Sequence, residues 1–254
     1  MELNYQIDGP NDAPVVVLSN SLGTTLAMWT PQLAALSAQY RVLRYDTHGH
    51  GATRKTGPTD LARLGQDVIA LLDHLDIPAA HFCGISMGGL TGLWLSCHQP
   101  QRLLSLTVIN SAARIGDEAG WHARAQSVRQ NGLHDIAVTA PERWFSPSFC
   151  QSAPQTVAAL AQQLADSSAE GYAACCDALA TADLREQISR ITRPVLLIAG
   201  EHDPVTTVDD ARFMHQHIAG SVLAVVKASH LSTIEAPTAV NAALLSFLGG
   251  QHAG

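Results

Sequence analysis

Short runs of apolar, often β-branched residues recur along the chain and alternate with segments whose apolar residues repeat at helical spacing. The runs lie at residues 15–18, 42–43, 80–83, 106–109, 195–198 and 222–226. Most are continuously apolar, which predicts strands buried on both faces. Helical spacing is clear at Leu61, Leu64, Val68, Leu71, Leu72 and Leu75. This alternation predicts an α/β fold with a mostly parallel central sheet and helices on both faces.

The alternation stops between about Arg114 and Arg190, where Ala, Gln, Arg and Trp at helical spacing replace the strand runs. This pattern predicts an inserted helical cap. A ligand in an open parallel sheet binds outside the carboxyl ends of the strands, so the insertion is expected to roof that crevice. We therefore expect three segments, a first core part at 1–113, the cap at 114–190 and a second core part at 191–254.

Composition excludes several classes of protein. Hydrophobic residues make up 46% of the 254 residues and charged residues 15%, which is typical of a globular chain and not of a disordered one. The formal net charge is −7 and no basic run occurs, which argues against nucleic acid and against an anionic membrane surface as partners. The sequence carries no signal for a particular oligomeric state.

The cysteines and the start of the chain indicate a compartment. There are five cysteines, an odd number without C-x-x-C spacing, which favours reduced thiols. The first residues have neither a basic region nor an apolar region of the kind that signal peptides carry, and the apolar runs are too short to span a bilayer. We expect a soluble cytoplasmic protein.

A G-x-S-x-G motif, Gly84-Ile85-Ser86-Met87-Gly88, follows the strand run 80–83 and precedes a helical pattern. This is the context of a nucleophile elbow, in which a sharp turn lifts the serine oxygen above the sheet at a helix N-terminus. The glycines are needed because backbone segments approach too closely there for a Cβ. The alternative interpretation is a plain strand-to-helix turn.

A serine nucleophile needs a base, and the base needs an acid that fixes its tautomer. Asp203 follows the strand run 195–198, and His230 follows the run 222–226, in the order Ser…Asp…His expected of this architecture. Taken alone, Asp203 could be a turn residue before a proline, and His230 a solvent-facing loop histidine. Glu201, in the same loop as Asp203, is the rival acid.

Two further patterns in the sequence concern an alternative position for the acid and a candidate metal site. After the strand run 106–109 the chain has Asn110-Ser111, and neither side chain can hold an imidazolium as a carboxylate does. The pairs His48-x-His50 and His215-x-His217 lack a third ligand at a recognisable spacing. We expect no metal, and hydrolysis by a serine needs no cofactor.

An oxyanion needs two backbone N–H donors. One is expected from Met87, directly after the nucleophile, and the other from Leu22 in the loop 19–24 after the first strand run. An ordinary glycine-containing turn is the alternative for that loop.

With these residues in hand, the chain resembles the α/β-hydrolase superfamily over its whole length, and within it the 3-oxoadipate enol-lactonases. The elbow identifies only the superfamily, whereas the strings Asn20-Ser21-Leu22-Gly23 and Asn110-Ser111-Ala112-Ala113-Arg114-Ile115-Gly116 are much closer to the lactonases. Further matches are Tyr45 to Gly51, Met87-Gly88-Gly89, Arg143-Trp144-Phe145 and Ala228-Ser229-His230. The chain departs from the family at His48, where the family usually has Arg, and at Ala52-Thr53 in place of a Ser.

The resemblance implies an α/β-hydrolase fold and the hydrolysis of a small enol-lactone to 3-oxoadipate in aromatic catabolism. Such a substrate carries an unreactive carboxylate, which needs a local cation when it is buried. The cap offers Arg114, Arg124, Arg129, Arg143, Arg185 and Arg190. The candidate substrate-binding residues are Trp144 and Arg143. The tryptophan that matches Trp144 is expected to line the pocket. If Trp144 points inward, Arg143 reaches only the rim, because adjacent helical residues do not share a face. An arginine on the solvated cap surface is the alternative for Arg143.

Three rival functions use the same residues. A broad carboxylesterase or a cofactor-free haloperoxidase-like hydrolase would have a neutral pocket. A ligand receptor built on a hydrolase fold would acylate once and slowly. A structural interaction module is disfavoured because serine, acid and base are all present.

Overall fold

Seven strands form one sheet in the computed structural model, which describes residues 2–53 and 55–251. The strand order is β1-β3-β2-β4-β5-β6-β7, and every neighbouring pair is parallel except β1 with β3. The strands are β1 (Tyr5–Asp8), β2 (Val15–Ser19), β3 (Arg41–Tyr45), β4 (Ala80–Ile85), β5 (Leu103–Ile109), β6 (Val195–Gly200) and β7 (Val222–Val226). The predicted mostly parallel sheet is confirmed.

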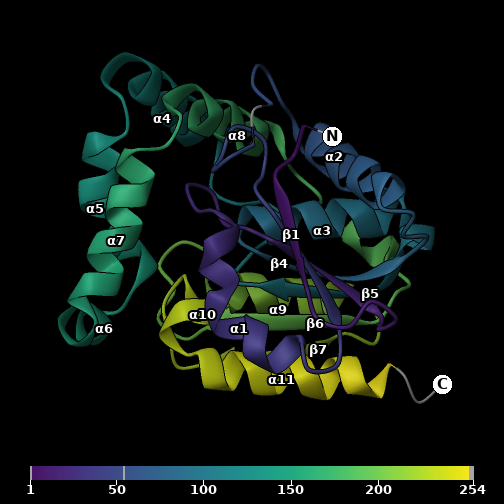
Figure 1. The fold of residues 1–254 in the computed structure, drawn as a ribbon. Helices are drawn as coiled ribbons and strands as arrows, with labels where there is room; N and C mark the ends of the chain where they lie inside the picture. The colour runs from purple at the N-terminus through teal and green to yellow at the C-terminus, as the bar shows by residue number, and fades with distance from the viewer. Residues whose placement is uncertain (1, 54, 252–254) are drawn as a thin grey trace.

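Helices cover both faces of this sheet (Figure 1). Helices α2 (Leu61–His74) and α3 (Met87–His98) pack together on one face, and α1 (Thr30–Leu36) and α11 (Pro237–Gly250) pack together on the other. Helix α9 (Val208–His217) contacts β6 and β7, and α10 (Ser232–Glu235) precedes α11. Three 3₁₀ helices complete this part of the chain, η1 (Leu26–Trp29), η2 (Pro100–Arg102) and η3 (Ile188–Arg190).

The two edge strands differ most from the sequence pattern. β1 is antiparallel, four residues long and only partly buried, so it has no continuous apolar run that would predict it. β7 carries an apolar run, yet Val222 and Val225 are 52% and 50% exposed. The reason is position, because an edge strand lacks the neighbour that would cover its outer side.

Five α-helices stand between β5 and β6 in the described chain and lie to one side of the sheet (Figure 1). They are α4 (Glu118–Asn131), α5 (His134–Trp144), α6 (Pro147–Ser152), α7 (Pro154–Ala165) and α8 (Ala169–Thr181). α4 packs on α8 and α5 packs on α7. The carboxyl ends of β4, β5 and β6 therefore open toward a separate helical layer.

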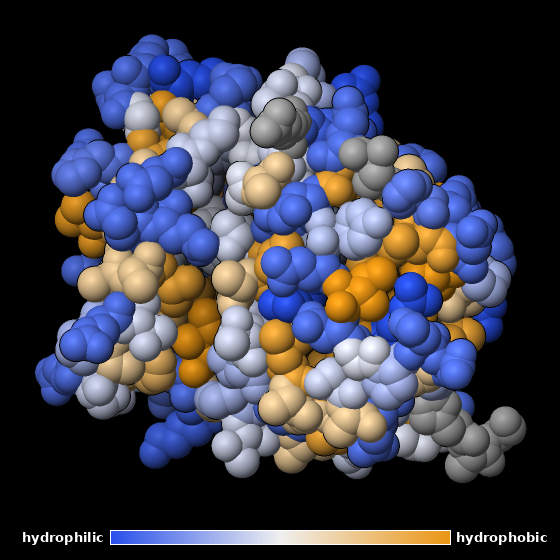
Figure 2. All heavy atoms as spheres, in the orientation of Figure 1, coloured by the Kyte–Doolittle hydropathy of each residue, from blue (hydrophilic) through white to orange (hydrophobic). Residues whose placement is uncertain are grey.

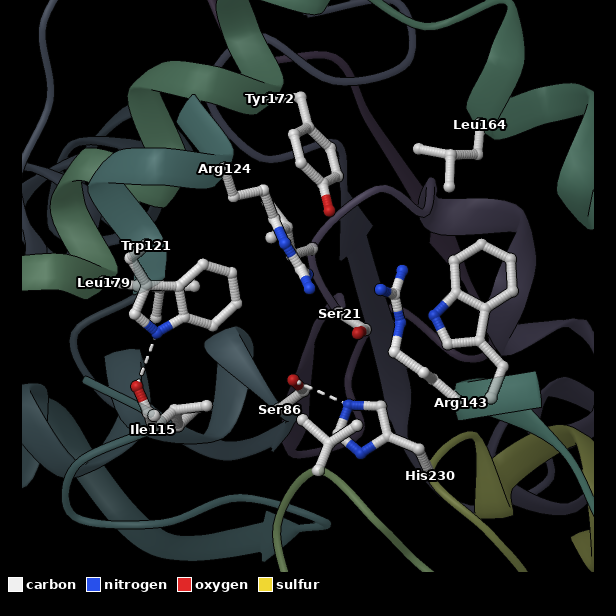
Figure 3. A pocket seen from close by; sticks show the side chains of 14 residues that line it. Ser21, Ser86, Ile115, Trp121, Arg124, Arg143, Leu164, Tyr172, Leu179 and His230 are labelled. Atoms are coloured by element: carbon white, nitrogen blue, oxygen red, sulfur yellow. Dashed lines mark hydrogen bonds between the residues drawn. The ribbon is translucent and has the colours of Figure 1, made fainter. Parts of the chain in front are cut away.

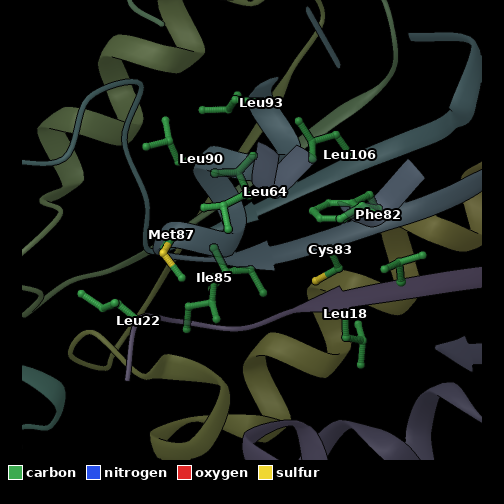
Figure 4. Close-up of a cluster of buried hydrophobic side chains, with 14 of the residues drawn as sticks. Leu18, Leu22, Leu64, Phe82, Cys83, Ile85, Met87, Leu90, Leu93 and Leu106 are labelled. Atoms are coloured by element: carbon green, nitrogen blue, oxygen red, sulfur yellow. The ribbon is translucent and has the colours of Figure 1, made fainter. Parts of the chain in front are cut away.

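The hydrophobic core lies between the sheet and its helices. Figure 4 shows Leu64 of α2 and Leu90 and Leu93 of α3 in one cluster with Phe82 and Leu106 of the sheet. A groove of about 370 Å³ between α7 and the core exposes apolar side chains (Figure 2). It is lined by Ala27, Met28, Thr30, Pro31, Thr156, Ala159, Leu160, Gln163 and Ile234.

Two observations bear on the compartment. Within residues 2–53 and 55–251, no helix combines the length and hydropathy that crossing a membrane requires. All five cysteines are free thiols.

Candidate active site

Ser86 occupies the sharp turn that the motif predicts. It connects β4 to α3 with φ 56° and ψ −119°, and its N–H donates to the Ile109 carbonyl over 2.9 Å. A non-glycine residue in this region costs about 1–3 kcal/mol, which the surrounding hydrogen bonds must offset. A Cβ on Gly84 would lie 2.1 Å from the Gly88 oxygen, and one on Gly88 would lie 2.2 Å from the Ser19 oxygen. Close backbone approach therefore requires both glycines.

Ser86, His230 and Asp203 are in hydrogen-bond contact. His230 Nε2 lies 2.9 Å from Ser86 Oγ, and His230 Nδ1 lies 2.8 Å from Asp203 Oδ2. The three residues are 5%, 3% and 6% exposed, respectively. With its Nδ1–H directed at the carboxylate, the imidazole presents Nε2 as an acceptor for the serine proton. The chain thus brings together three residues that are far apart in sequence.

The Asp203 carboxylate is held by several donors besides His230. Its oxygens accept from the N–H groups of Val205 (2.8 Å) and Thr206 (3.1 Å), from Thr206 Oγ1 (2.8 Å) and from Asn110 Nδ2 (2.8 Å). Burial by itself raises the pKa of Asp203, but the hydrogen bond and charge of His230, together with the bonds from Asn110 and Val205, hold the pKa below its usual value. The Asp203 side chain is therefore ionised in the folded protein at neutral pH.

Asn110 is a site residue that the sequence reasoning missed. From the sequence, position 110 is considered only for the acid that holds the histidine, and an amide cannot fill that role. In the structure, the Asn110 amide donates to Asp203 and its Oδ1 accepts from Ser232 Oγ. Its φ of 42° is one of the three positive values found for non-glycine residues in the described chain. Positive φ is tolerated best by asparagine among such residues, which is the one local signal that could have indicated its role.

The rival positions fall elsewhere. The Glu201 side chain is exposed, whereas Asp203 is buried. Each histidine of the two pairs has a ring nitrogen within hydrogen-bond distance of a protein atom. His48 Nε2 is 2.9 Å from the Gly57 oxygen, and the Nδ1 atoms of His215 and His217 are 2.9 Å from Ser221 Oγ and 2.8 Å from the Phe213 oxygen.

The expected oxyanion donors lie on adjoining segments. Gly88 N donates to the Asn20 oxygen over 3.1 Å, which joins the loop 19–24 to the elbow. Met87 is the first residue of α3, so its N–H has no acceptor within the helix. In the part of the chain that the structure describes, no hydrogen bond uses the N–H of Leu22 or of Met87. Figure 4 shows the Leu22 and Met87 side chains in the cluster of buried apolar side chains that includes Ile85.

A cavity of about 230 Å³ opens directly above Ser86 and His230 (Figure 3). Core residues form its floor, and helices α4, α5, α7 and α8 supply most of its walls. The lining residues are Ser21, Leu22, Ser86, Ile115, Gly116, Trp121, Arg124, Arg143, Trp144, Leu164, Tyr172, Leu179, Val205 and His230. The helices between β5 and β6 therefore lie over Ser86 and His230.

Two arginines point into this cavity. Figure 3 shows the guanidinium groups of Arg124, from α4, and Arg143, from α5, converging on the space above Ser86. Among the described residues, neither one lies within ion-pair distance of a carboxylate. Arg124 Cζ lies 5.0 Å from the centroid of the Trp121 ring, a cation–π contact that supports its side chain.

The charges in the cavity affect one another. The pKa of Arg143 is lowered, mainly by burial and further by the neighbouring charge of Arg124. An anion bound between the two guanidinium groups would act in the opposite direction and favour their charged forms. Burial raises the pKa of Tyr172 to about 12, although both arginines act in the opposite direction. The cavity is thus a positively charged space with a neutral phenol on its wall.

Trp144 and Arg143, the two candidate substrate-binding residues, both line the cavity, although adjacent helical residues do not share a face. Helix α5 ends at Trp144, and Figure 3 shows the long Arg143 side chain extending toward the space above Ser86. Arg124, Trp121 and Tyr172 were not singled out by the sequence as pocket residues.

The other cap arginines are engaged elsewhere. Arg114 and Arg185 pair with Asp183, and Arg129 pairs with Glu170 and Asp177. Arg190 is exposed at the end of η3.

These features define an alpha/beta hydrolase. The chain matches the model of the alpha/beta hydrolase fold family over residues 14–237, and it belongs to that family. It is similar to 3-oxoadipate enol-lactonase 2 of Acinetobacter baylyi, with 54% identity over 243 residues, 95% of this chain and 91% of that protein. It is also similar to 3-oxoadipate enol-lactonase 1 of the same organism, with 53% identity over 235 residues, 92% of this chain and 88% of that protein.

A solved structure agrees with these relatives. The enol-lactonase from Burkholderia xenovorans LB400 superposes with a TM-score of 0.95 at 42% sequence identity, covering 97% of this chain and 96% of that one. The resemblance to the enol-lactonases predicted from the motifs is confirmed.

Proposed function

We propose that the protein hydrolyses 3-oxoadipate enol-lactone to 3-oxoadipate. The observation that carries the proposal is the placement of Arg124 and Arg143, without carboxylate partners in the described chain, over the Ser86–His230 contact in one cavity. A lactone with a free carboxylate offers an ester carbonyl to Ser86 and a negative charge to the two arginines. The names of the two Acinetobacter relatives and of the Burkholderia structure support the choice of lactone.

The proposed reaction begins with acylation. Ser86 Oγ attacks the lactone carbonyl while His230 Nε2 takes its proton, and Asp203 stabilises the imidazolium that forms. The N–H groups of Leu22 and Met87 hold the oxyanion. The ring C–O bond then breaks, its electron pair goes to the enol oxygen, and His230 returns the proton to that oxygen. The product is an acyl ester on Ser86 whose chain carries the new enol, and this enol tautomerises to a ketone.

Deacylation repeats the chemistry with water. His230 accepts a proton from the water that attacks the ester, and it then returns the proton to Ser86 Oγ as the acid leaves. Atoms and protons balance over the two halves with water as the only co-reactant. We propose that no metal and no cofactor takes part.

The cap supplies substrate recognition in this proposal. An arginine binds a carboxylate through two parallel N–H donors, and removal of both groups from bulk water strengthens the contact. Arg143 and Arg124 would hold the unreactive carboxylate, while Trp144 and Trp121 form apolar walls around the ring. A neutral ester would leave two half-buried guanidinium groups without a counter-charge, which disfavours the broad esterase.

We further propose that residues 114–190 act as a cap between core parts 1–113 and 191–254, supported by helices α4 to α8 between β5 and β6. The free thiols support a reducing compartment, and we propose a cytoplasmic location.

The test is a direct assay of the purified protein on the enol-lactone, with the product identified by nuclear magnetic resonance. We expect multiple turnover to 3-oxoadipate and a kcat/KM at least about tenfold above that for the methyl ester of the same lactone, which lacks the charge. A single slow acylation would indicate a receptor instead. Equal values for the acid and its methyl ester would contradict carboxylate recognition.

A further inference from the structure

A buried histidine outside the Ser86–His230–Asp203 contacts joins the loop 19–24 to a second loop. His50 follows β3, is 2% exposed and lies next to Tyr172 of the cap, with ring centroids 6.5 Å apart. The mechanism above does not use it. Its two ring nitrogens are nevertheless both engaged, and each contact has a defined direction.

The contacts fix the protonation state of His50. Gly23 N–H donates to His50 Nε2 over 3.0 Å, so this nitrogen carries a lone pair. His50 Nδ1 therefore holds the proton and donates it to the His48 oxygen over 2.9 Å. Burial lowers the pKa of His50 and outweighs the His48 bond and the charge of Asp46, which act in the opposite direction. A neutral imidazole with one donor and one acceptor is what the two loops require.

The hydrogen bond that His50 Nε2 accepts lies next to the proposed oxyanion hole. The Gly23 N–H belongs to the peptide plane directly after Leu22, so the bond to His50 restricts how that plane can rotate. The plane before Leu22 is held by Thr24, whose Oγ1 and N–H donate to the Ser21 oxygen over 2.8 and 3.2 Å. Since the Leu22 N–H lies in that same plane and opposite the Ser21 oxygen, it is directed away from Thr24.

The loop that carries His50 is itself anchored. Asp46 accepts from Ala52 N–H over 2.9 Å and from Leu26 N–H over 2.8 Å. Gly23 has φ 79°, and a Cβ there would lie 2.8 Å from a methyl group of Leu164. The Leu22–Gly23 segment is therefore confined by the cap on one side and by His50 on the other.

We propose that His50 is a positioning residue for the oxyanion hole, acting through the Gly23 N–H to hold the Leu22 amide toward Ser86. This inference rests on the proposed serine chemistry. It does not depend on the identity of the lactone.

The test uses two substitutions that differ in where they place an acceptor. In His50→Gln the side-chain oxygen can reach the position of Nε2, whereas in His50→Asn the polar atoms reach only the position of Nδ1. His50→Leu fills the space without an acceptor and serves if the Asn variant does not fold. His217→Asn, on the exposed end of α9, is the matched control.

Loss of one oxyanion donor costs about 10²–10³ in kcat, and a misplaced donor should cost less. We expect His50→Asn and His50→Leu to lower kcat about tenfold or more with little change in KM, and His50→Gln to stay within about threefold of the wild type. Inhibition by a boronic acid, which forms a tetrahedral adduct on the serine, should weaken in parallel with kcat. The thermal midpoint of each variant is recorded alongside.

Turnover is measured on both the enol-lactone and p-nitrophenyl acetate. If the wild type hydrolyses only the activated ester, the lactone assignment fails while the comparison of His50 variants remains valid. Equal kcat values for the Gln, Asn and Leu variants on the ester would overturn the proposal. So would a loss confined to KM, or boronic acid inhibition that does not change.

Discussion

At the scale of single residues, the site depends on groups that hold other groups in place. Ser86 adopts a positive φ because its N–H is bound by Ile109, and its carbonyl oxygen accepts from Ser111 Oγ over 2.7 Å. Asp203 is surrounded by donors and directs one oxygen at His230. Such preorganisation removes the cost of aligning nucleophile and base at the moment of reaction.

The acid can be tested by two substitutions in one loop. Asp203→Asn should lower lactone turnover by about 10⁴, because an amide stabilises the wrong imidazole tautomer, as measured in a serine protease. Glu201→Gln should change turnover by less than about threefold, since that side chain is exposed. Steady-state kcat of the two variants is the measurement. The reverse order of effects would assign the acid to Glu201.

The lowered pKa of Asp203 also predicts a dependence of stability on pH. In the unfolded chain the pKa of an aspartate is about 3.9, and the pKa of Asp203 in the folded protein lies below it, so the unfolded chain binds more protons in the acid range. The stability that ionised Asp203 contributes is complete above the unfolded pKa and is lost as pH falls through the folded pKa. The gap in thermal midpoint between wild type and Asp203→Asn should therefore narrow below about pH 4. A gap that is constant with pH would refute this, and Glu201→Gln provides the control.

At the scale of elements, the proposed mechanism places the reaction at the strand ends and the substrate selectivity in helices α4 and α5. β4, β6 and β7 are followed by Ser86, Asp203 and His230, while α4 and α5 carry the two arginines. Leu231 N donates to the Trp144 oxygen over 2.9 Å, and Glu235 accepts from Ser229 N over 2.9 Å and binds Ser146 Oγ. These bonds tie the end of α5 to the loop that carries the base.

The arginines provide a prediction at this scale. Arg143→Gln or Arg124→Gln should lower kcat/KM for the lactone by more than about tenfold, because a buried guanidinium–carboxylate contact is lost, while p-nitrophenyl acetate turnover stays nearly constant. Arg185→Gln is the matched control, since Arg185 pairs with Asp183 on the cap surface. Equal losses on both substrates in the Arg124 and Arg143 variants would remove these residues from carboxylate recognition.

Elements with a continuous local signal could be predicted from the sequence, and the others could not. The apolar runs predicted β2 and β6, and the repeat from Leu61 to Leu75 predicted α2, because burial on both faces or on one stripe selects those patterns. β1 was missed, since an exposed edge strand of four residues needs no such pattern.

At the scale of the whole molecule, the charge of the chain opposes its proposed substrate. The formal net charge is −7, so an anionic lactone is attracted only where cations are concentrated without carboxylate partners. Folding produces that place by bringing α4 and α5 over the strand ends.

The packing of segments that are far apart in the sequence also explains which site residues could not be predicted from the sequence. Ser86, Asp203 and His230 follow strand ends in a known order, which is a pattern in one dimension. Arg124 and Tyr172 face the cavity only because α4 packs on α8, and Asn110 meets Asp203 only because β5 and β6, which are far apart in the sequence, are neighbours in the sheet. Contacts between helices of an insertion leave no fixed spacing, so the sequence offered six cap arginines and singled out Arg143 only through its neighbour Trp144, while Arg124 carried no signal of its own.

Ser86 is the proposed nucleophile in the hydrolysis of the enol-lactone. The most direct measurement is the rate of lactone loss with wild-type protein and with Ser86→Ala at equal concentration, after correction for the spontaneous rate. We predict a fall of at least about 10⁴, since the remaining oxyanion donors and binding contacts accelerate a reaction with water only weakly. If the Ala variant kept more than a few per cent of the wild-type rate, another group would be the nucleophile and the proposed mechanism would be wrong.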